Sequence, residues 1–467
     1  MMIRKIFLVL ILVFGFSTFI NAQNNNLFFN IKGFYGDKAV LFSINGDNMQ
    51  PIDTAYKQST GSFVFFNIDI LPTGVYSIYF NDSLYSEVII NKEEIVIRAN
   101  ANNLLASMDV RKSIENKILF DYWKYAMLVK DSIVYLEYQI RKIEQKTYDS
   151  NHPDIKKIEN RINTFNKNIE NYIYSQGKKY PDKFAPVLLE AYLVPDMENY
   201  NKVNPKKKYD DEDVFLREHF FDNINFGDER FLQTKVLYTS INDYIQTYGA
   251  PASTVNYNYV IDKVMAMAVG NNKVYEYCLD LFIQTFEPSV YENVLVHLID
   301  DYYIPYYTLS GVSTVYYSHL SERIKALKPG KKSPNFVLSD PSGVEYNLYK
   351  TKGKAKMIVF YSSDCQHCAD ALPSLLEIAE MYKSQGLVSF GVAIDDDEKI
   401  WKKEINKFSM KWISVSDLKG LSSPLVDLFN INSTPFILLL NEDNIIMKKP
   451  MEINDIHSTL VQLLNDI

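Results

Sequence analysis

The sequence of 467 residues has very few cysteines. Only three are present, and two of them, Cys365 and Cys368, are separated by two residues. Three cysteines are too few for a fold that is held together by several disulfides. Cys278 lies apart, on the apolar face of a predicted helix. We expect it to be a buried, inert thiol; a regulatory or intermolecular thiol is the alternative.

The sequence also lacks basic blocks and metal-ligand clusters. It has 49 Lys and Arg against 57 Asp and Glu, and a formal net charge of −8. Nucleic acid is therefore not expected as a partner. The histidines at 219, 297 and 319 are isolated, and no phosphate-binding loop is found. We expect no metal site at these histidines.

One segment, residues 1–22, has the pattern of a targeting signal. Arg4 and Lys5 precede the apolar run Ile6–Phe16, and the small residue Ala22 precedes Gln23. This pattern predicts a cleaved secretory signal. An uncleaved anchor is the alternative, but the run is shorter than the ~20 residues of a membrane span. We expect export to the periplasm or cell envelope, with no transmembrane segment after cleavage.

Residues 23–107 are predicted to form a β domain. Short runs rich in β-branched and aromatic residues are separated by Gly and Asn turns, which is typical of an antiparallel β-sandwich or barrel. No candidate catalytic residue is visible in it. The expected strands are 28–31, 39–44, 62–66, 75–80, 86–90 and 94–97.

Residues 108–327 are predicted to form an all-α domain. Arg111–Thr147 is free of Gly and Pro, and Asp154–Gln176 follows a polar turn, so an antiparallel helical hairpin is expected, ending at Gly177. Tyr and Phe are abundant, which indicates core filling; a ligand groove is the alternative. Further helices are expected at 182–193, 211–222, 229–248, 256–269, 272–286, 288–300 and 312–327.

Residues 328–467 are predicted to form an α/β domain. The segment Lys328–Pro334 combines charge, Pro and Gly and marks a boundary. Strand-like and helix-like runs then alternate. The expected strands are 335–338, 344–348, 357–361, 387–394, 412–415, 435–440 and 445–448.

The pair Cys365 and Cys368 lies where a helix is expected to begin. The buried strand Met357–Tyr361 and the polar turn Ser362–Asp364 precede it. A helix N-terminus carries partial positive charge and unpaired N–H groups, which stabilise a thiolate. We therefore predict an exposed, acidic thiol at Cys365 and, one turn later, a thiol at Cys368 that resolves mixed disulfides.

Other uses of the two cysteines are less consistent with the sequence. A c-type haem site requires histidine directly after the second cysteine, where this chain has Ala369. A zinc or copper(I) site using both cysteines and His367 lacks a second ligand cluster. A structural disulfide would close a very small loop, which constrains the unfolded chain little.

The segment Thr434–Pro435 needs its own explanation. A proline that opens an apolar strand removes a hydrogen-bond donor from the sheet. A cis Thr434–Pro435 bond that turns the chain beside the dithiol would explain it and would leave the Thr434 backbone free to pair with a substrate peptide. A trans proline at a sheet edge is the alternative.

Residues 329–467 resemble the thioredoxin superfamily, and within it the TlpA/ResA-like exported thiol–disulfide oxidoreductases. The resemblance rests on Pro334-Asn335-Phe336, Gly353-Lys354, the strand and Cys-Gln-His-Cys segment, Pro373, the strand ending at Asp395, and Thr434-Pro435. It implies Cys365 as nucleophile, Cys368 as resolving thiol, a substrate groove shaped by cis Pro435, and no cofactor beyond a redox-active Cys365–Cys368 disulfide.

The chain departs from the family pattern at two positions. Asp364 replaces the usual aromatic residue before the first cysteine, and Val359 replaces the buried acid of thioredoxin. We expect Asp364 to raise the pKa of Cys365 and a protonated His367 to lower it. One acid of the run Asp395–Glu398 is a candidate proton acceptor, with a solvated loop as the alternative.

These observations predict an exported thiol–disulfide oxidoreductase that acts on protein thiols or disulfides. The reducing direction and an upstream thiol electron donor are expected from the resemblance alone. The alternative is a cell-envelope protein that binds a partner protein or glycan and carries a vestigial or sensory dithiol.

Overall fold

The computed structural model describes residues 25–150 and 152–464. The predicted signal, residues 1–22, lies outside the described residues. The described chain divides into two compact units, one reaching Gln246 and including Ala268–Val274, the other comprising Thr247–Met267 and everything from Tyr275 onward. The proposed domain limits at 107 and 327 stay predictions. No described helix is both long and apolar enough to span a membrane.

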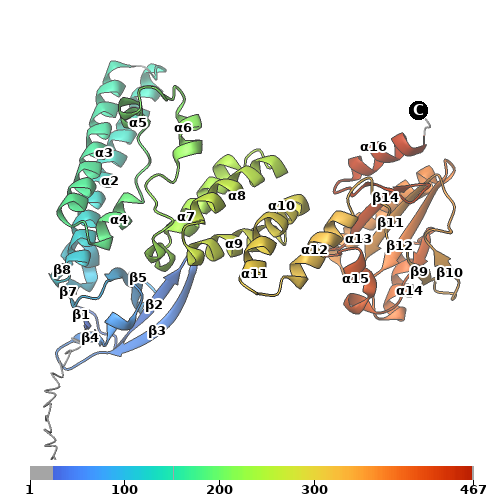
Figure 1. Ribbon diagram of the computed structural model, residues 1–467, viewed down its shortest axis with the longest axis horizontal. Coiled ribbons are helices and arrows are strands. Elements are labelled where there is room, and N and C mark those ends of the chain that lie inside the picture. The colour runs from blue at the N-terminus through green and yellow to red at the C-terminus, as the bar shows by residue number, and fades with distance from the viewer. Residues whose placement is uncertain (1–24, 151, 465–467) are drawn as a thin grey trace, which may run out of the picture. The chain divides into compact units, whose positions relative to one another are not determined.

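The first unit begins with two four-stranded sheets (Figure 1). The first sheet has the order β4-β1-β7-β8, and its strands are Ser62–Phe65 (β4), Leu27–Lys32 (β1), Ile95–Asn100 (β7) and Asp109–Lys112 (β8). The second has the order β3-β2-β5-β6, and its strands are Asn48–Tyr56 (β3), Lys38–Asn45 (β2), Gly74–Asn81 (β5) and Leu84–Ile90 (β6).

The two sheets enclose one apolar core. Buried and partly exposed residues alternate along β1 and β7, as expected for strands with one face inward. Phe29 from one sheet packs edge-on against Phe80 from the other, with ring centroids 4.9 Å apart. The predicted fold class is confirmed. The parallel pairing of β1 with β7 was not anticipated, because strand direction depends on contacts far apart in sequence.

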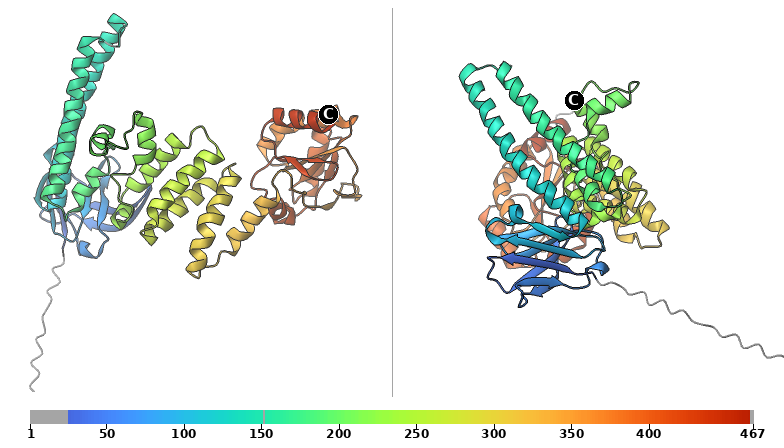
Figure 2. Two further views of the ribbon diagram at one scale, coloured as in Figure 1. Left: turned by 45° about the horizontal axis from the view of Figure 1, so that its top comes forward. Right: turned by 90° about the vertical axis from the view of Figure 1, so that its left-hand side faces the viewer.

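A long helical hairpin follows the sheets. It consists of α2 (Ile114–Thr147) and α3 (Pro153–Lys179), which lie side by side along their length (Figure 2). The Ser113 hydroxyl caps α2 by accepting from the Asn116 N–H at 3.0 Å. The helix end expected at Gly177 is wrong: α3 continues two residues further, because interhelical packing outweighs the cost of about 1 kcal/mol of an interior glycine.

A buried acid joins the first turn of α2 to helix α4 (Phe184–Glu190). The Glu115 side chain is fully buried, and its carboxylate accepts from the backbone N–H groups of Phe184 at 2.9 Å and Ala185 at 2.6 Å. Asn91 is the residue after β6, and its side-chain amide donates to the same carboxylate. Glu115 therefore fixes α4 and the sheet to α2.

The remaining helices before the C-terminal domain are shorter. The predicted helical character of this region is confirmed, although short helices at 197–203 and 304–309 were not expected. These elements are η1 (Ile68–Ile70), η2 (Ala101–Asn103), α1 (Leu104–Ser107), α5 (Met197–Val203), α6 (Glu212–His219), η3 (Glu229–Gln233), α7 (Val236–Tyr248), α8 (Thr254–Ala268), α9 (Asn272–Phe286), α10 (Glu292–His297), the π-helix η4 (Leu298–Tyr303), α11 (Ile304–Leu309) and α12 (Val315–Ala326).

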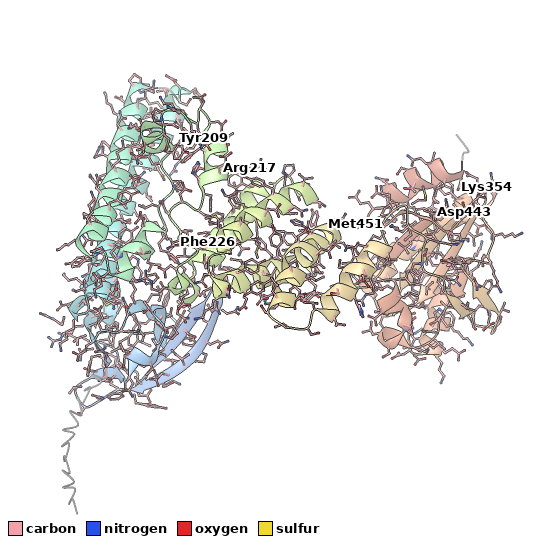
Figure 3. All side chains as sticks on the ribbon, in the orientation of Figure 1. Tyr209, Arg217, Phe226, Lys354, Asp443 and Met451 are labelled. Atoms are coloured by element: carbon pink, nitrogen blue, oxygen red, sulfur yellow. The ribbon has the colours of Figure 1, made fainter. Side chains whose placement is uncertain are left out.

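The C-terminal domain is built on a five-stranded mixed sheet of order β13-β12-β11-β14-β15 (Figure 1). Its strands are Ile413–Val415 (β13), Leu387–Ala393 (β12), Ala355–Tyr361 (β11), Phe436–Asn441 (β14) and Ile446–Lys448 (β15). β11 runs parallel to β12 and antiparallel to β14. Lys354, before β11, and Asp443, in the β14–β15 turn, accordingly lie at one end of the sheet (Figure 3).

Both faces of this sheet are covered, which explains why all seven residues of β11 are buried. Met357 and Val359 of β11 face one core and Ile358 and Phe360 face the other. The remaining elements are the hairpin β9 (Val337–Ser339) and β10 (Glu345–Asn347), and the helices α13 (Gln366–Lys383), α14 (Glu398–Lys407), η5 (Gly420–Ser422), α15 (Pro424–Leu428) and α16 (Ile453–Leu464).

Candidate functional site

Cys365 occupies the N-cap position of α13. Its backbone is extended, with φ −89° and ψ 115°, and its sulfur accepts a hydrogen bond from the Cys368 N–H at 3.3 Å. The side chain is partly exposed, and both cysteines are free thiols. The first sulfur thus lies where N–H groups and the helix dipole favour negative charge.

Hydrogen bonds make Cys365 more acidic than an ordinary thiol. Partial burial raises the pKa of Cys365, but the side chains of Thr434 and Cys368 and the backbone N–H groups of Cys368 and His367 hydrogen-bond its sulfur. Together these bonds outweigh burial, and the pKa of Cys365 is lowered. The thiolate, which is the nucleophilic form of cysteine, is therefore favoured at this position.

Cys368 has the opposite environment. Its side chain is fully buried in a cluster with Tyr361, Leu372 and Trp401. Burial raises the pKa of Cys368 to about 12, and its hydrogen bond to Cys365 acts in the same direction. Two thiols within one helical turn are therefore clearly different: the first is accessible and acidic, and the second is protected and protonated.

The Thr434–Pro435 peptide bond is cis, and the structure places it beside the dithiol. The Cys365 thiol donates to the Thr434 carbonyl oxygen at 3.3 Å. The Thr434 side chain also hydrogen-bonds both sulfurs and favours the thiolate at each. The segment expected to shape a substrate groove therefore touches the sulfur directly.

Asp395 anchors the turn that leads into Cys365. The carboxylate, which is 8% exposed, accepts from the Ser363 N–H at 2.9 Å and from the hydroxyls of Ser363 at 2.6 Å and Ser362 at 3.2 Å. The Ser362 N–H in turn hydrogen-bonds the Cys368 sulfur. The sequence pointed to the acidic run 395–398 as a possible proton acceptor; the structure shows a loop anchor at Asp395.

The other candidate residues have different environments. Asp364 and His367 are exposed, and neither side-chain charge is among the causes that shift the pKa of Cys365. Val359 is fully buried in β11. Cys278 is fully buried in α9, where burial raises its pKa to about 12. Among the described residues, no group of three or more His, Cys, Asp or Glu is placed to hold a metal ion.

Aromatic residues behind Cys368 were missed by sequence reasoning. The Trp401 Nε1–H donates to the Tyr361 hydroxyl at 3.2 Å, and that hydroxyl donates to the Met410 sulfur at 3.7 Å. These bonds satisfy the polar atoms of a buried cluster that packs against Cys368. The apolar run Met357–Tyr361 placed Tyr361 in a strand but did not show which residues it would contact.

The C-terminal region of the chain is similar to known proteins. The Redoxin family matches residues 328–464. The thiol-disulfide oxidoreductase ResA of a Bacillus cereus strain is 25% identical over 136 residues, covering 29% of this chain and 76% of the relative. ResA of Halalkalibacterium halodurans is 27% identical over 135 residues, covering 29% and 74%.

Solved structures include similar chains. A thioredoxin-like protein from Bacteroides caccae is 20% identical, with a TM-score of 0.41, and the match covers 54% of this chain and 92% of that one. The thioredoxin domain of a Bacteroides vulgatus thiol-disulfide oxidoreductase is 27% identical, with a TM-score of 0.29 and coverage of 30% and 99%.

The family match, the mixed sheet and the dithiol at the start of α13 together define the C-terminal region as a domain of the thioredoxin superfamily. Within that superfamily it is a TlpA/ResA-like, thioredoxin-like oxidoreductase domain.

Proposed function

We propose that the protein is an exported thiol–disulfide oxidoreductase that exchanges disulfides with protein substrates through Cys365 and Cys368. The observation that carries the proposal is the contrast between the two thiols, one partly exposed with a lowered pKa and one buried with a raised pKa. This contrast separates a nucleophile from a resolving thiol.

In the reducing direction the Cys365 thiolate attacks one sulfur of a substrate disulfide. The substrate S–S bond breaks, a mixed disulfide forms, and one substrate thiolate leaves and is protonated. Cys368 then loses its proton and attacks the Cys365 sulfur, which releases the second substrate thiol and closes a Cys365–Cys368 disulfide. Two electrons pass from the dithiol to the substrate, and an upstream thiol donor restores the reduced state.

The roles of the neighbouring residues follow from their contacts. Thr434 and cis Pro435 form the wall of the substrate groove beside the reactive sulfur, where an extended peptide would approach. Asp364 and His367 lie exposed beside Cys365, where they modulate the approach of charged substrates. We propose the Cys365–Cys368 disulfide as the redox group, without a further cofactor.

Export rests on the pattern of residues 1–22, and we place the mature protein in the periplasm or cell envelope. Expression of the full chain in a bacterium followed by fractionation and N-terminal mass spectrometry tests this. A mature N-terminus at Gln23 in the envelope or periplasmic fraction is expected; an intact N-terminus in the cytosolic fraction contradicts export.

Insulin reduction with dithiothreitol as the electron source tests the catalytic proposal. Cys365→Ser should abolish turnover, and Cys368→Ser should accumulate mixed disulfides with substrate proteins. Cys278→Ala is the matched control, since its thiol is buried and distant in sequence from the dithiol. Full activity of Cys365→Ser, or a Cys365–Cys368 pair that dithiothreitol cannot reduce, would overturn the proposal in favour of a cell-envelope binding protein.

A further inference from the structure

The end of the C-terminal sheet that carries the dithiol is acidic. β11, β12 and β13 run parallel, so their carboxyl ends lie at one edge of the sheet, where the dithiol loop follows β11. The loops that follow these three strands are residues 362–370, 394–399 and 416–423. They contain seven acids and two lysines, which are Asp364, Asp370, Asp395, Asp396, Asp397, Glu398 and Asp417, and Lys399 and Lys419.

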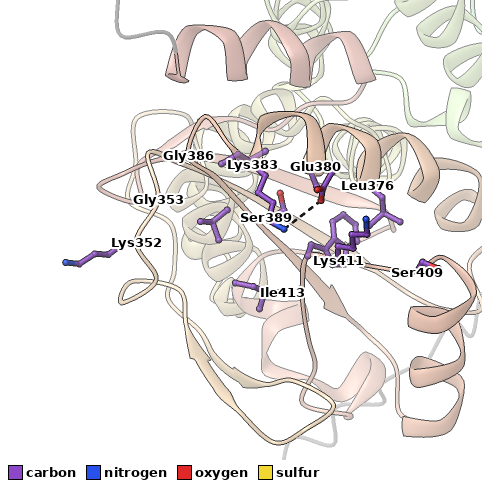
Figure 4. A pocket seen from close by; sticks show the side chains of 14 residues that line it. Lys352, Gly353, Leu376, Glu380, Lys383, Gly386, Ser389, Ser409, Lys411 and Ile413 are labelled. Carbon is purple, nitrogen blue, oxygen red and sulfur yellow. Dashed lines mark ion pairs between the residues drawn. The ribbon is translucent and has the colours of Figure 1, made fainter.

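The opposite end of the same sheet carries more positive than negative charge. Figure 4 shows Lys352, Lys383 and Lys411 among the residues that line a pocket at this end, with Glu380 paired to Lys383 at 3.8 Å. The segments that precede β11, β12 and β13, and the β14–β15 turn, are residues 352–354, 383–386, 409–412 and 441–445. They contain four lysines and two acids, which are Lys352, Lys354, Lys383 and Lys411, and Glu442 and Asp443.

Hydrogen bonds and packing hold the three acidic loops next to the dithiol. The Asp395 carboxylate accepts from the Ser363 N–H at 2.9 Å, two residues before Cys365. The Asp395 carbonyl oxygen accepts from the Gly420 N–H at 3.2 Å, which connects the second loop with the third. The Leu418 side chain packs against the same buried cluster as Cys365. The three loops therefore form one acidic surface around the reactive sulfur.

The acid nearest to the nucleophile in sequence forms no ion pair. Asp364 directly precedes Cys365, is exposed, and has no hydrogen bond or ion pair within residues 25–150 and 152–464. Asp370, one turn further into α13, accepts from a neutral side-chain amide at 2.8 Å. Glu398, by contrast, pairs with Lys402 at 2.7 Å. The charge of Asp364 therefore faces solvent beside the reactive sulfur without a cationic partner in the described chain.

Negative charge around a nucleophile discriminates among charged substrates. A surface of one sign accelerates the encounter with groups of the opposite sign and opposes groups of the same sign. The Cys365 thiolate adds a further negative charge at the centre of this surface. The charge of Asp364 is not among the causes that shift the pKa of Cys365. Its effect therefore falls on the approaching substrate and not on the acidity of the thiol.

We propose that the dithiol selects protein disulfides that are flanked by lysine or arginine, and that Asp364 is the main specificity-determining residue. The proposal rests on the oxidoreductase function and names the class of substrate at the same site. The exchange itself is unchanged. The substrate S–S bond breaks, two electrons pass from Cys365 and Cys368, whose sulfurs form a disulfide, and the two substrate sulfurs take up two protons from the dithiol and solvent.

Three synthetic peptides test the proposal. They share one disulfide-closed loop, which is flanked by lysines, by glutamines or by glutamates. The reduced full chain is mixed with each peptide, thiols are blocked after set times, and mass spectrometry gives the rate constant of peptide reduction. Neighbouring charges also change the pKa of the peptide's own thiols and hence how fast they leave. Each rate constant is therefore divided by the rate constant for mercaptoethanol, a small thiol without a charged surface.

The corrected rate constants should depend on peptide charge and on salt. At an ionic strength of about 0.01 M, where charges interact over ~30 Å, we expect the lysine peptide to be reduced about tenfold faster than the glutamate peptide. The glutamine peptide should be intermediate. At about 1 M, where the screening length is ~3 Å, the corrected rate constants of the three peptides should become similar.

Single substitutions identify the residue that carries the preference. Asp364→Asn should lower the corrected preference for the lysine peptide about two- to threefold at low ionic strength, and Asp364→Lys should lower it further. Asp443→Asn is the matched control, because it makes the same change in net charge in the β14–β15 turn at the other end of the sheet (Figure 3). It should leave the preference unchanged. The pH profile of Cys365 alkylation by iodoacetamide, a neutral reagent, should be the same in Asp364→Asn as in the unmodified chain.

Three results would overturn this proposal and leave the oxidoreductase function in place. The first is equal corrected rate constants for the three peptides at low ionic strength. The second is a lysine preference that Asp364→Asn and Asp364→Lys do not lower. The third is a loss of preference in Asp364→Asn that is accompanied by a shifted alkylation profile, which would assign Asp364 to thiol acidity. Failure of the chain to reduce any of the peptides would overturn both proposals together.

Discussion

The Cys365 sulfur lies 3.3 Å from the backbone oxygen of Thr434, which follows it by 69 residues. The same sulfur lies 3.3 Å from the N–H of Cys368, its near neighbour in sequence. The Cys365 sulfur therefore connects the start of α13 with the loop that precedes β14. The N–H contact favours the Cys365 thiolate, whereas the Thr434 carbonyl oxygen can accept only from the protonated thiol.

Alkylation should distinguish the two thiols by pH. Because the pKa of Cys365 is lowered, its thiolate forms at lower pH than the thiolate of an ordinary cysteine. Its labelling by iodoacetamide should therefore reach half its maximum at a pH below about 8.5, which is the pKa of an ordinary cysteine thiol. Cys368, with a pKa raised to about 12, should label slowly until strongly alkaline pH. Mass spectrometry of the reduced chain across a pH series measures the labelling of each cysteine. Labelling of Cys368 before Cys365 would contradict the assignment of Cys365 as the nucleophile.

Thr434→Val should make Cys365 less acidic while keeping the side-chain shape. The Thr434 side chain is the largest of the groups that lower the pKa of Cys365, and valine cannot donate a hydrogen bond. We expect alkylation at neutral pH to slow about three- to tenfold and the pH profile to shift upward. Ser433→Ala, at the exposed neighbouring position, is the control. An unchanged profile for Thr434→Val would contradict this role of the Thr434 side chain.

Asp395→Ala should loosen the turn before Cys365. Removing the carboxylate leaves the Ser363 N–H and two hydroxyls without their acceptor, which should lower the free energy of unfolding of the C-terminal domain by about 1–3 kcal/mol. Hydrogen exchange of residues 362–368 should become faster and insulin reduction slower. The exposed neighbour Asp396, replaced by Ala, should show neither effect. Normal exchange in Asp395→Ala would rule out the anchoring role.

Glu115→Gln should destabilise the first compact unit. Glutamine replaces one acceptor oxygen by an NH₂ group that would face the backbone N–H groups of Phe184 or Ala185. Loss of a hydrogen bond to a charged group predicts a decrease of about 1.5–3 kcal/mol in the free energy of unfolding. Faster hydrogen exchange at the start of α4 should accompany a lower thermal midpoint. Glu137→Gln, at an exposed site of α2, is the control; equal stabilities of the two variants would contradict the prediction.

Local sequence patterns were sufficient to predict the fold class and to place the two cysteines at the start of a helix. The uninterrupted helical pattern of Arg111–Thr147 indicated α2, and alternating strand and helix patterns indicated the C-terminal α/β domain. The two-residue gap between Cys365 and Cys368 placed both thiols in the first turn of a helix. These features depend on hydrogen bonds between near neighbours, so short stretches of sequence encode them.

Tertiary structure alone decided which distant groups meet. It brought Thr434 to the Cys365 sulfur and set Asp395 as the acceptor of the Ser362–Ser363 turn. It also paired β1 with β7 in parallel. Such contacts join segments tens of residues apart, and they arise from how whole sheets and helices pack, which no local pattern specifies.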